Sequence, residues 1–173
     1  MRPPRTAEKR KVRVVTYDLE FISGLRMSDR RCVVLLASDG DDEVDAAPVF
    51  HSLDEEQQRT LRYRFDQWID NVQHNKHWSH GFDQEGYREC FVFKWKHKNM
   101  GHRLYGFLCH PLLRTNRRFY LCVLTNHDKK PLMQWETKIE NLDTANRLRV
   151  TPHVLAAISM KFPDQPPGTT QCH

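Results

Sequence analysis

The stretch Cys90–Asn126, CFVFKWKHKNMGHRLYGFLCHPLLRTNRRFYLCVLTN, decides how this chain is organised. It contains three runs rich in aromatic and β-branched residues, at 88–96, 102–110 and 119–124, which favour strands. The connections between these runs are short, and they predict an antiparallel meander. Along the first run, residues alternate between an aromatic set and a partly basic set, so its two faces differ in chemistry. The aromatic set is Phe91, Phe93 and Trp95, and the other set is Cys90, Val92, Lys94 and Lys96.

The same stretch has a strong charge bias. The whole chain has 27 Lys and Arg against 22 Asp and Glu, yet none of these acids lies within 90–126. A local positive field attracts phosphate, because a polyanion releases its counterions when it binds. Aromatic rings among the cations suit single strands, whose unstacked bases can lie on ring faces. We therefore expect RNA as a ligand. The alternative is a solvated sheet face whose aromatic residues simply form the core.

Two strands and a helix are predicted before the meander. Apolar and polar residues alternate over 11–21, and the apolar run 32–36 suits a more buried strand. The acidic segment 39–45 is predicted to be a solvated loop. Ser52-Leu53-Asp54-Glu55 has the pattern of a capping box, which predicts that a helix starts at Ser52. The apolar face of this helix is spaced at helical intervals, through Leu61, Phe65, Trp68, Ile69 and Val72.

Helical patterns follow the meander. Residues 135–148 carry apolar side chains at helical spacing, and Thr151-Pro152 has the cap and first-turn proline of a last helix. The order of elements predicts an α+β fold, with a small antiparallel sheet and helices packed on one side. The 173 residues suit one domain over 11–162, with 11–47 as a strand-rich extension or insertion. Residues 1–10 are expected to be a flexible basic arm, and 163–173 a flexible tail.

The cysteine content and the lengths of the apolar runs indicate the cellular environment of the protein and the cofactors that it needs. The five cysteines form no C-x-x-C pair, so we expect reduced thiols and a cytoplasmic location rather than disulfides or a zinc site. The set Cys109, His110, Cys122 and His127 matches no familiar ligand spacing, and no metal or cofactor is expected. No apolar run is long enough to cross a membrane, so no membrane partner is expected.

Three cations are predicted to converge. Lys94 and Lys96 are two residues apart on a strand and project from one face, and Arg103 returns on the neighbouring strand. Mutual repulsion lowers the pKa of a lysine, so that more of it can act as a base near neutral pH. A guanidinium stabilises charge on phosphate oxygens. The pair Lys129-Lys130 is expected at the rim of this face, where it can protonate a leaving oxygen. The alternative is a lysine-rich edge strand that prevents aggregation.

The chain resembles the bacterial RelE/ParE/HigB toxin superfamily, and its phage-derived RelE-like branch in particular. The resemblance covers roughly residues 48–150. It depends on Lys94-Trp95-Lys96 and Gly101-His102-Arg103-Leu104, on a hairpin that follows a long amphipathic helix. The later run Val123–Lys130 and a helix containing Ala145 and Arg147 continue the same order.

This resemblance implies that the protein is the toxin of a type II toxin–antitoxin system. Such a toxin cuts messenger RNA without a metal ion, often on the ribosome. It implies Lys94 and Lys96 as base and transition-state stabiliser, Arg103 as the phosphate-binding residue and Lys130 as general acid. The implied partners are RNA and a cognate antitoxin protein. The alternative is a non-catalytic member of the same fold that inhibits gyrase or binds RNA.

Other residues are expected to contact RNA. No tyrosine follows Tyr120, so Trp135 replaces the late tyrosine with which some members of the superfamily stack RNA. Among the histidines, His127 beside the lysine pair is favoured over His102, which a regular strand directs away from Arg103. The full set of RNA-contacting candidates is Lys98, Arg114, Arg117, Arg118, His127, Lys129 and Trp135.

Overall fold

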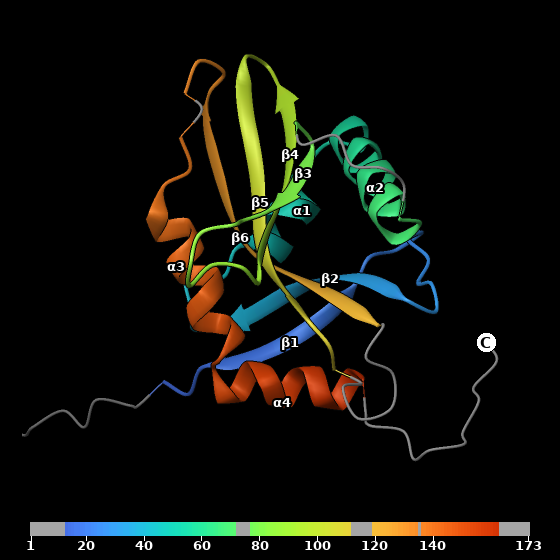
Figure 1. Ribbon diagram of the computed structural model, residues 1–173, viewed down its shortest axis with the longest axis vertical. Helices are drawn as coiled ribbons and strands as arrows, with labels where there is room; N and C mark the ends of the chain where they lie inside the picture. Colours follow the sequence, from blue (N-terminus) through green and yellow to red (C-terminus); the bar gives the residue numbers. More distant parts are fainter. Residues whose placement is uncertain (1–12, 72–76, 112–118, 135, 163–173) are drawn as a thin grey trace, which may run out of the picture.

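The computed structural model describes residues 13–71, 77–111, 119–134 and 136–162, and over these ranges it is an α+β fold, as predicted (Figure 1). The strands are β1 (Thr16–Phe21), β2 (Arg31–Asp39), β3 (Ser79–Gly81), β4 (Cys90–His97), β5 (Met100–Cys109) and β6 (Tyr120–Pro131). The helices are α1 (Ala46–Ser52), α2 (Glu55–Ile69), α3 (Ile139–Arg149) and α4 (Pro152–Lys161). Residues 1–10 and 163–173, predicted as a basic arm and a tail, lie outside the described residues.

The six strands form one sheet in the order β1-β2-β6-β5-β4-β3. The predicted meander is confirmed, because β4 pairs antiparallel with β5 and β5 antiparallel with β6. The sheet as a whole is mixed rather than antiparallel, since β2 runs parallel to β6. Strand β2 lies between β1 and β6 and buries Cys32–Leu36 completely or nearly so. Residues 31–39 therefore form an interior strand of the sheet.

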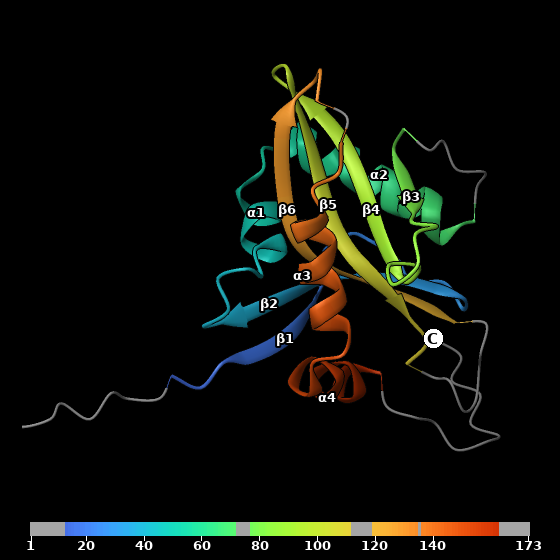
Figure 2. The ribbon, with the colours of Figure 1, turned by 60° about the vertical axis from the view of Figure 1, so that its left-hand side comes forward.

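Helices cover both faces of the sheet, so the prediction of helices on one side is wrong. Helices α1 and α2 pack on one face, here called the α2 face, and α3 and α4 pack on the other, here called the α3 face. Figure 2 shows α3 in front of β5 and β6, while α2 lies behind the sheet. The reason lies in β2, where Val33 and Leu35 face one way and Val34 and Leu36 the other. Apolar residues in both directions require cover on both faces.

Helix α2 packs as its apolar spacing predicts. Leu61, Phe65, Trp68 and Ile69 are buried in one cluster with Phe91, Phe93 and Trp95. The rings of Phe65 and Phe93 meet edge to face, with centroids 4.8 Å apart. Burial of each such side chain stabilises the fold by about 1.5–3 kcal/mol. Val72, the last residue of the predicted apolar face, lies outside the described residues.

The start of α2 differs from the prediction. The N-cap is Asp54, whose carboxylate accepts from the backbone N–H of Gln57 at 2.8 Å. Ser52 instead ends the unpredicted helix α1, and its hydroxyl donates to the carbonyl of Val49 at 2.7 Å. An N-cap such as that of Asp54 stabilises a helix by about 1 kcal/mol. The last helix begins as predicted, with Thr151 at the N-cap and Pro152 in the first turn.

A β-bulge in β6 sets which side chains share a face. Tyr105 pairs with Asn126 but Gly106 pairs with Leu124, so Thr125 is the extra residue. The bulge needs the glycine, because a Cβ on Gly106 would lie 2.1 Å from the carbonyl oxygen of Val123. Beyond the bulge the alternation of β6 is reversed. Asn126, Asp128 and Lys130 therefore lie beside Tyr105, Arg103 and Gly101 on the α3 face.

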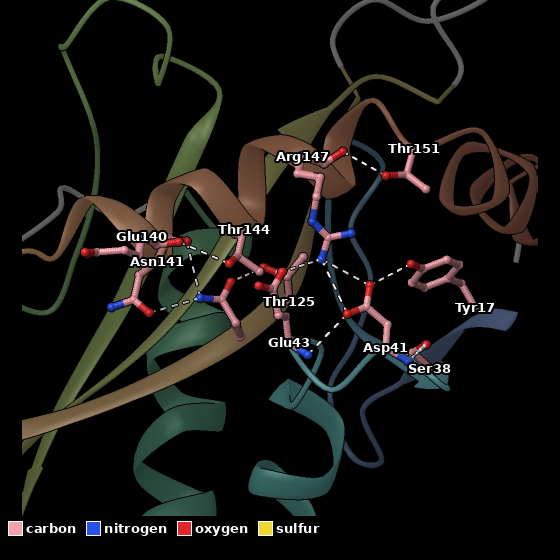
Figure 3. A network of polar contacts seen from close by, with 11 residues as sticks. Tyr17, Ser38, Asp41, Glu43, Thr125, Glu140, Asn141, Thr144, Arg147 and Thr151 are labelled. Atoms are coloured by element: carbon pink, nitrogen blue, oxygen red, sulfur yellow. Dashed lines mark hydrogen bonds and ion pairs between the residues drawn. The ribbon is translucent and has the colours of Figure 1, made fainter. Parts of the chain in front are cut away.

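Helix α3 is tied to the N-terminal strands by a polar network (Figure 3). The Arg147 guanidinium lies 3.1 Å from the Asp41 carboxylate and 2.7 Å from that of Glu43, and the Tyr17 hydroxyl donates to Asp41 at 2.7 Å. Although burial opposes it, hydrogen bonds from Tyr17 and Arg147 lower the pKa of Asp41. The acidic segment predicted as a solvated loop is thus partly paired, and it fixes the position of α3. None of the helices in the described residues is long and apolar enough to span a membrane.

Candidate functional site

Two rows of side chains cross β4, β5 and β6 on the α3 face. Lys94 is paired with Arg103, and Arg103 with Asp128. One step nearer the hairpin turn, Lys96 is paired with Gly101, and Gly101 with Lys130. Directly paired residues of antiparallel strands point to the same face. The pairing therefore brings Lys94, Lys96 and Arg103 together, as their spacing predicted.

These rows lie beyond the part of the face that α3 covers. The helix starts only at Ile139, and its buried residues Leu142 and Ala145 pack on Cys90, Val92 and Tyr105. Strands β4, β5 and β6 continue past this N-terminal end (Figure 2). A pocket of about 200 Å³ occupies the uncovered end. Its lining combines both lysines and the arginine with residues before β3 and after β6: His77, Trp78, Lys94, Trp95, Lys96, Gly101, His102, Arg103, Pro131, Leu132 and Gln134.

Gly101 helps to form this pocket. It stands between Lys96 and Lys130 in the second row and has no side chain to fill the space between them. A Cβ built on Gly101 would meet only Lys130 O at 3.7 Å and Leu132 Cδ2 at 3.9 Å, both ordinary contacts. The backbone would therefore tolerate a side chain here. The glycine at this position leaves the space beside Lys96 open within the pocket.

The three cations of the pocket have different environments. Lys94 is half-buried, and burial first and the Arg103 charge second lower the pKa of its ammonium group. The direction is the one predicted, although repulsion is the lesser cause. Arg103 is 7% exposed, and Lys96 is exposed. The pocket thus combines a lysine whose pKa is lowered by burial, a nearly buried guanidinium and an exposed ammonium group.

Lys130 does not belong to the open rim. It is 4% exposed, its ammonium donates to the carbonyl of Glu136, and it lies 3.5 Å from the carboxylate of Asp128. The connection from β6 to α3 folds over this side chain and removes it from solvent. Lys130 was predicted as general acid, but an ammonium held in this way stabilises the fold around the pocket instead.

The other half of the lysine pair faces away from the pocket. Lys129 is paired with His102, and His102 with Trp95, in a row on the α2 face. His127 lies on that face too, where its ring is 3.1 Å from His102. Burial, then the His102 charge, lower the pKa of His127 to about 4. The prediction that His102 points away from Arg103 is confirmed, and the preference for His127 and Lys129 as RNA contacts is not supported by this placement.

The remaining predicted contacts lie elsewhere. Lys98 is exposed in the two-residue turn between β4 and β5, where it and Asn99 have positive φ values of 45° and 59°. The turn is thus Lys98-Asn99, and Gly101 belongs to the strand. Arg114, Arg117, Arg118 and Trp135 lie outside the described residues, and their role stays a prediction.

Several pocket residues escaped the sequence analysis. His77 and Trp78 come from a segment with no periodicity, and Gln134 from the connection after β6. Arg64 of α2 does not line the pocket, but its guanidinium lies over Trp78, 4.2 Å from the ring centroid, and donates to the carbonyl of Lys94. The pairing of β3 with β4 brings His77 and Trp78 beside the lysines of β4. No local sequence pattern predicts this pairing.

Within the described ranges, no three His, Cys, Asp or Glu side chains are grouped so that they could hold a metal ion. Comparisons with protein-family models, with curated proteins and with solved structures each gave no match to this chain.

Proposed function

We propose that the protein is the toxin of a type II toxin–antitoxin system and cuts messenger RNA at the Lys94/Arg103 pocket without a metal ion. The observation that carries this proposal is the convergence of Lys94, Lys96 and Arg103 in one pocket. The amphipathic helix followed by a hairpin, on which the resemblance to the RelE/ParE/HigB superfamily depends, is α2 followed by β4 and β5. Antitoxin and ribosome are the partners that this resemblance implies.

The chemistry is an attack by the ribose 2′ oxygen on the adjacent phosphorus. Neutral Lys94 takes the proton of the 2′ hydroxyl as the O2′–P bond forms. Arg103 and protonated Lys96 stabilise the charge that develops on the non-bridging oxygens. The P–O5′ bond breaks, and the products are a 2′,3′-cyclic phosphate and a 5′ hydroxyl. The lowered pKa of Lys94 supports its role as the base, because a larger fraction is neutral near physiological pH.

The 5′ oxygen needs a proton, and Lys130 is buried away from the pocket. His77 is the better candidate for this general acid, because it is exposed and lines the pocket together with Lys94 and Lys96. An imidazole readily donates a proton near neutral pH. On this assignment the base comes from β4 and the acid from the segment that precedes β3.

The test is cleavage of single-stranded RNA and of ribosome-bound message in the presence of a chelator. We expect cuts whose upstream fragments end in a 2′,3′-cyclic phosphate, and no cut where a single 2′-deoxy nucleotide replaces the cleaved one. His77→Gln is expected to slow cleavage, because glutamine cannot supply the proton that the 5′ oxygen needs. Expression of the wild type should arrest bacterial growth, and the Lys94→Met/Lys96→Ala variant should not.

A second candidate function is RNA binding without cleavage. The observation that favours it is the buried and paired ammonium of Lys130. The resemblance to the superfamily implies that this residue is the general acid. Intact RNA in every cleavage assay, with salt-dependent RNA binding that Lys96→Ala weakens, would select this function over the nuclease.

A further inference from the structure

Trp78 is held between the pocket and the helix behind it. One contact is made by the Arg64 guanidinium from α2, whose central carbon lies 4.2 Å from the centroid of the indole. The backbone provides a second restraint, because the carbonyl of Trp78 accepts from the N–H of Lys94 at 2.7 Å. Arg64 is itself held by its bond to the carbonyl of Lys94. The indole is therefore fixed relative to the lysine that we propose as the base.

Fixation of this kind is what a stacking platform requires. An aromatic ring already ordered before binding loses little conformational entropy when a ligand arrives. Trp78 is half-buried and lines the pocket, so part of its surface is exposed there. Arg64 also places a positive charge close to the ring, and burial lowers the pKa of this guanidinium to about 10 without removing its charge at neutral pH.

The other tryptophan that lines the pocket is already in use. Trp95 is 1% exposed, its indole N–H donates to Gln57 at 2.9 Å, and its ring stacks on His102 at 4.8 Å. Its aromatic surface belongs to the α2 face. Of the two tryptophans that line the pocket among the described residues, only Trp78 retains exposed surface for a ligand.

We propose that Trp78 is the stacking platform for a nucleobase next to the phosphate that Lys94 and Arg103 bind. The inference rests on the proposed function of this pocket, and it names the part of the substrate that the pocket recognises besides phosphate. Stacking of a base on an aromatic side chain tolerates every base, because each has a π face. The platform therefore positions the RNA chain, while Lys94 and Arg103 hold the phosphate.

The experiment measures binding, so it does not depend on cleavage. The probes are a short single-stranded 2′-fluoro oligonucleotide, which has no 2′ hydroxyl to attack, and an abasic sugar-phosphate chain of the same length and charge. The variants are Trp78→Leu, which removes the π face, and Trp78→Phe, which retains one. Tyr63→Leu is the matched control, because Tyr63 is an exposed aromatic residue of α2 that does not line the pocket. Thermal unfolding verifies that each variant is folded.

We expect Trp78→Leu to weaken binding of the base-containing probe about tenfold, to leave binding of the abasic probe unchanged, and to slow RNA cleavage correspondingly. Trp78→Phe should recover most of the loss, and Tyr63→Leu should match the wild type. Equal weakening of both probes by Trp78→Leu would mean that the indole only supports the structure, and an unchanged affinity for both would likewise overturn the platform. Failure of the wild type to bind either probe would instead overturn the proposed function itself.

Discussion

The outer halves of β4, β5 and β6 have two faces built from alternate residues of the same strands, and these faces differ in almost every respect. On the α2 face, Trp95 is buried in one cluster with the apolar residues of α2, and its ring stacks on His102, which lies beside His127. On the α3 face, the neighbouring residues Lys94 and Arg103 line an open pocket.

The extent to which a helix covers each face, rather than the sheet itself, creates the candidate site. Helix α2 reaches far enough for Gln57, near its start, to bind Trp95. Helix α3 begins at Ile139 and leaves the rows of Lys94 and Lys96 uncovered. The α2 face is therefore core, and the uncovered end of the α3 face is the candidate site.

The largest effect is expected for removal of the proposed base. Lys94→Met keeps the length of the side chain but has no amine, and we expect cleavage to fall by about 10²–10⁴-fold. Because burial lowers the pKa of Lys94 below its ordinary value, the wild-type rate should rise with pH as the neutral amine accumulates. The measurement is the single-turnover cleavage rate as a function of pH. A variant with the wild-type rate and profile would exclude Lys94 as the base.

The opposite face should respond in stability. Trp95→Ala removes a fully buried ring and leaves the buried amide of Gln57 without its indole partner, so we expect a loss of about 3–5 kcal/mol in the free energy of unfolding. Lys96→Ala, one residue further on, should change it by no more than about 0.5 kcal/mol, because its side chain is exposed. Urea unfolding of both variants gives the comparison. Similar losses would remove the distinction between core face and site face.

Two glycines of β5 sharpen the same contrast. Gly106→Ala places a methyl group 2.1 Å from the Val123 carbonyl, and since backbone must move, we expect a loss of about 3 kcal/mol or more. Gly101→Ala makes only ordinary contacts, and its stability should stay within about 0.5 kcal/mol of the wild type. The methyl group of Gly101→Ala should nevertheless weaken RNA binding, because it enters the pocket. Thermal unfolding and RNA titration of the two variants separate these effects, and equal stabilities would contradict the bulge geometry.

The partly buried position of His127 on the α2 face predicts that the stability of the fold falls at acidic pH. The pKa of His127 is lowered to about 4 by burial first, then by His102, with Lys129 acting in the same direction and Asp128 in the opposite one. In the unfolded chain its pKa is near 6.5. Stability is therefore complete above about pH 6.5 and is lost as the pH falls toward 4, because only the unfolded chain takes up the proton.

The expected loss from His127 is on the order of 2 kcal/mol after allowance for its partial exposure. Urea unfolding of the wild type and of His127→Gln across this range is the measurement, with His153→Gln on the exposed surface of α4 as the control. The His127 variant should lose less stability on acidification than the wild type. Identical pH dependence of the two would show that His127 is not held neutral by the fold.

Much of this contrast was accessible from the sequence. The alternation in Cys90–Lys96 predicts both faces of β4, and the apolar spacing of α2 predicts which of them it covers. The return of Arg103 opposite Lys94 follows from a short hairpin turn. These are local patterns with fixed periods, and the structure confirms them.

The remainder depends on interactions that no local pattern contains. The bulge at Thr125 reverses the alternation of β6, so the orientations of Lys129 and Lys130 could not be read from their positions in a regular strand. The burial of Lys130 depends on a connection that folds back to Glu136. Trp78 and Arg64 meet because a three-residue strand joins the edge of the sheet. Asp54 caps α2 in place of Ser52, because Ser52 is the last residue of α1.

The most direct test of the central claim compares Lys96→Ala with Lys129→Ala. Both side chains are exposed lysines on neighbouring parts of the meander, and each substitution removes one positive charge, but Lys96 lies on the α3 face and Lys129 on the α2 face. With chelator present, we expect Lys96→Ala to reduce the rate of RNA cleavage on the order of a hundredfold and Lys129→Ala to change it by less than about twofold. Equal effects of the two substitutions, or a larger effect of Lys129→Ala, would contradict the assignment of function to the open pocket of the α3 face.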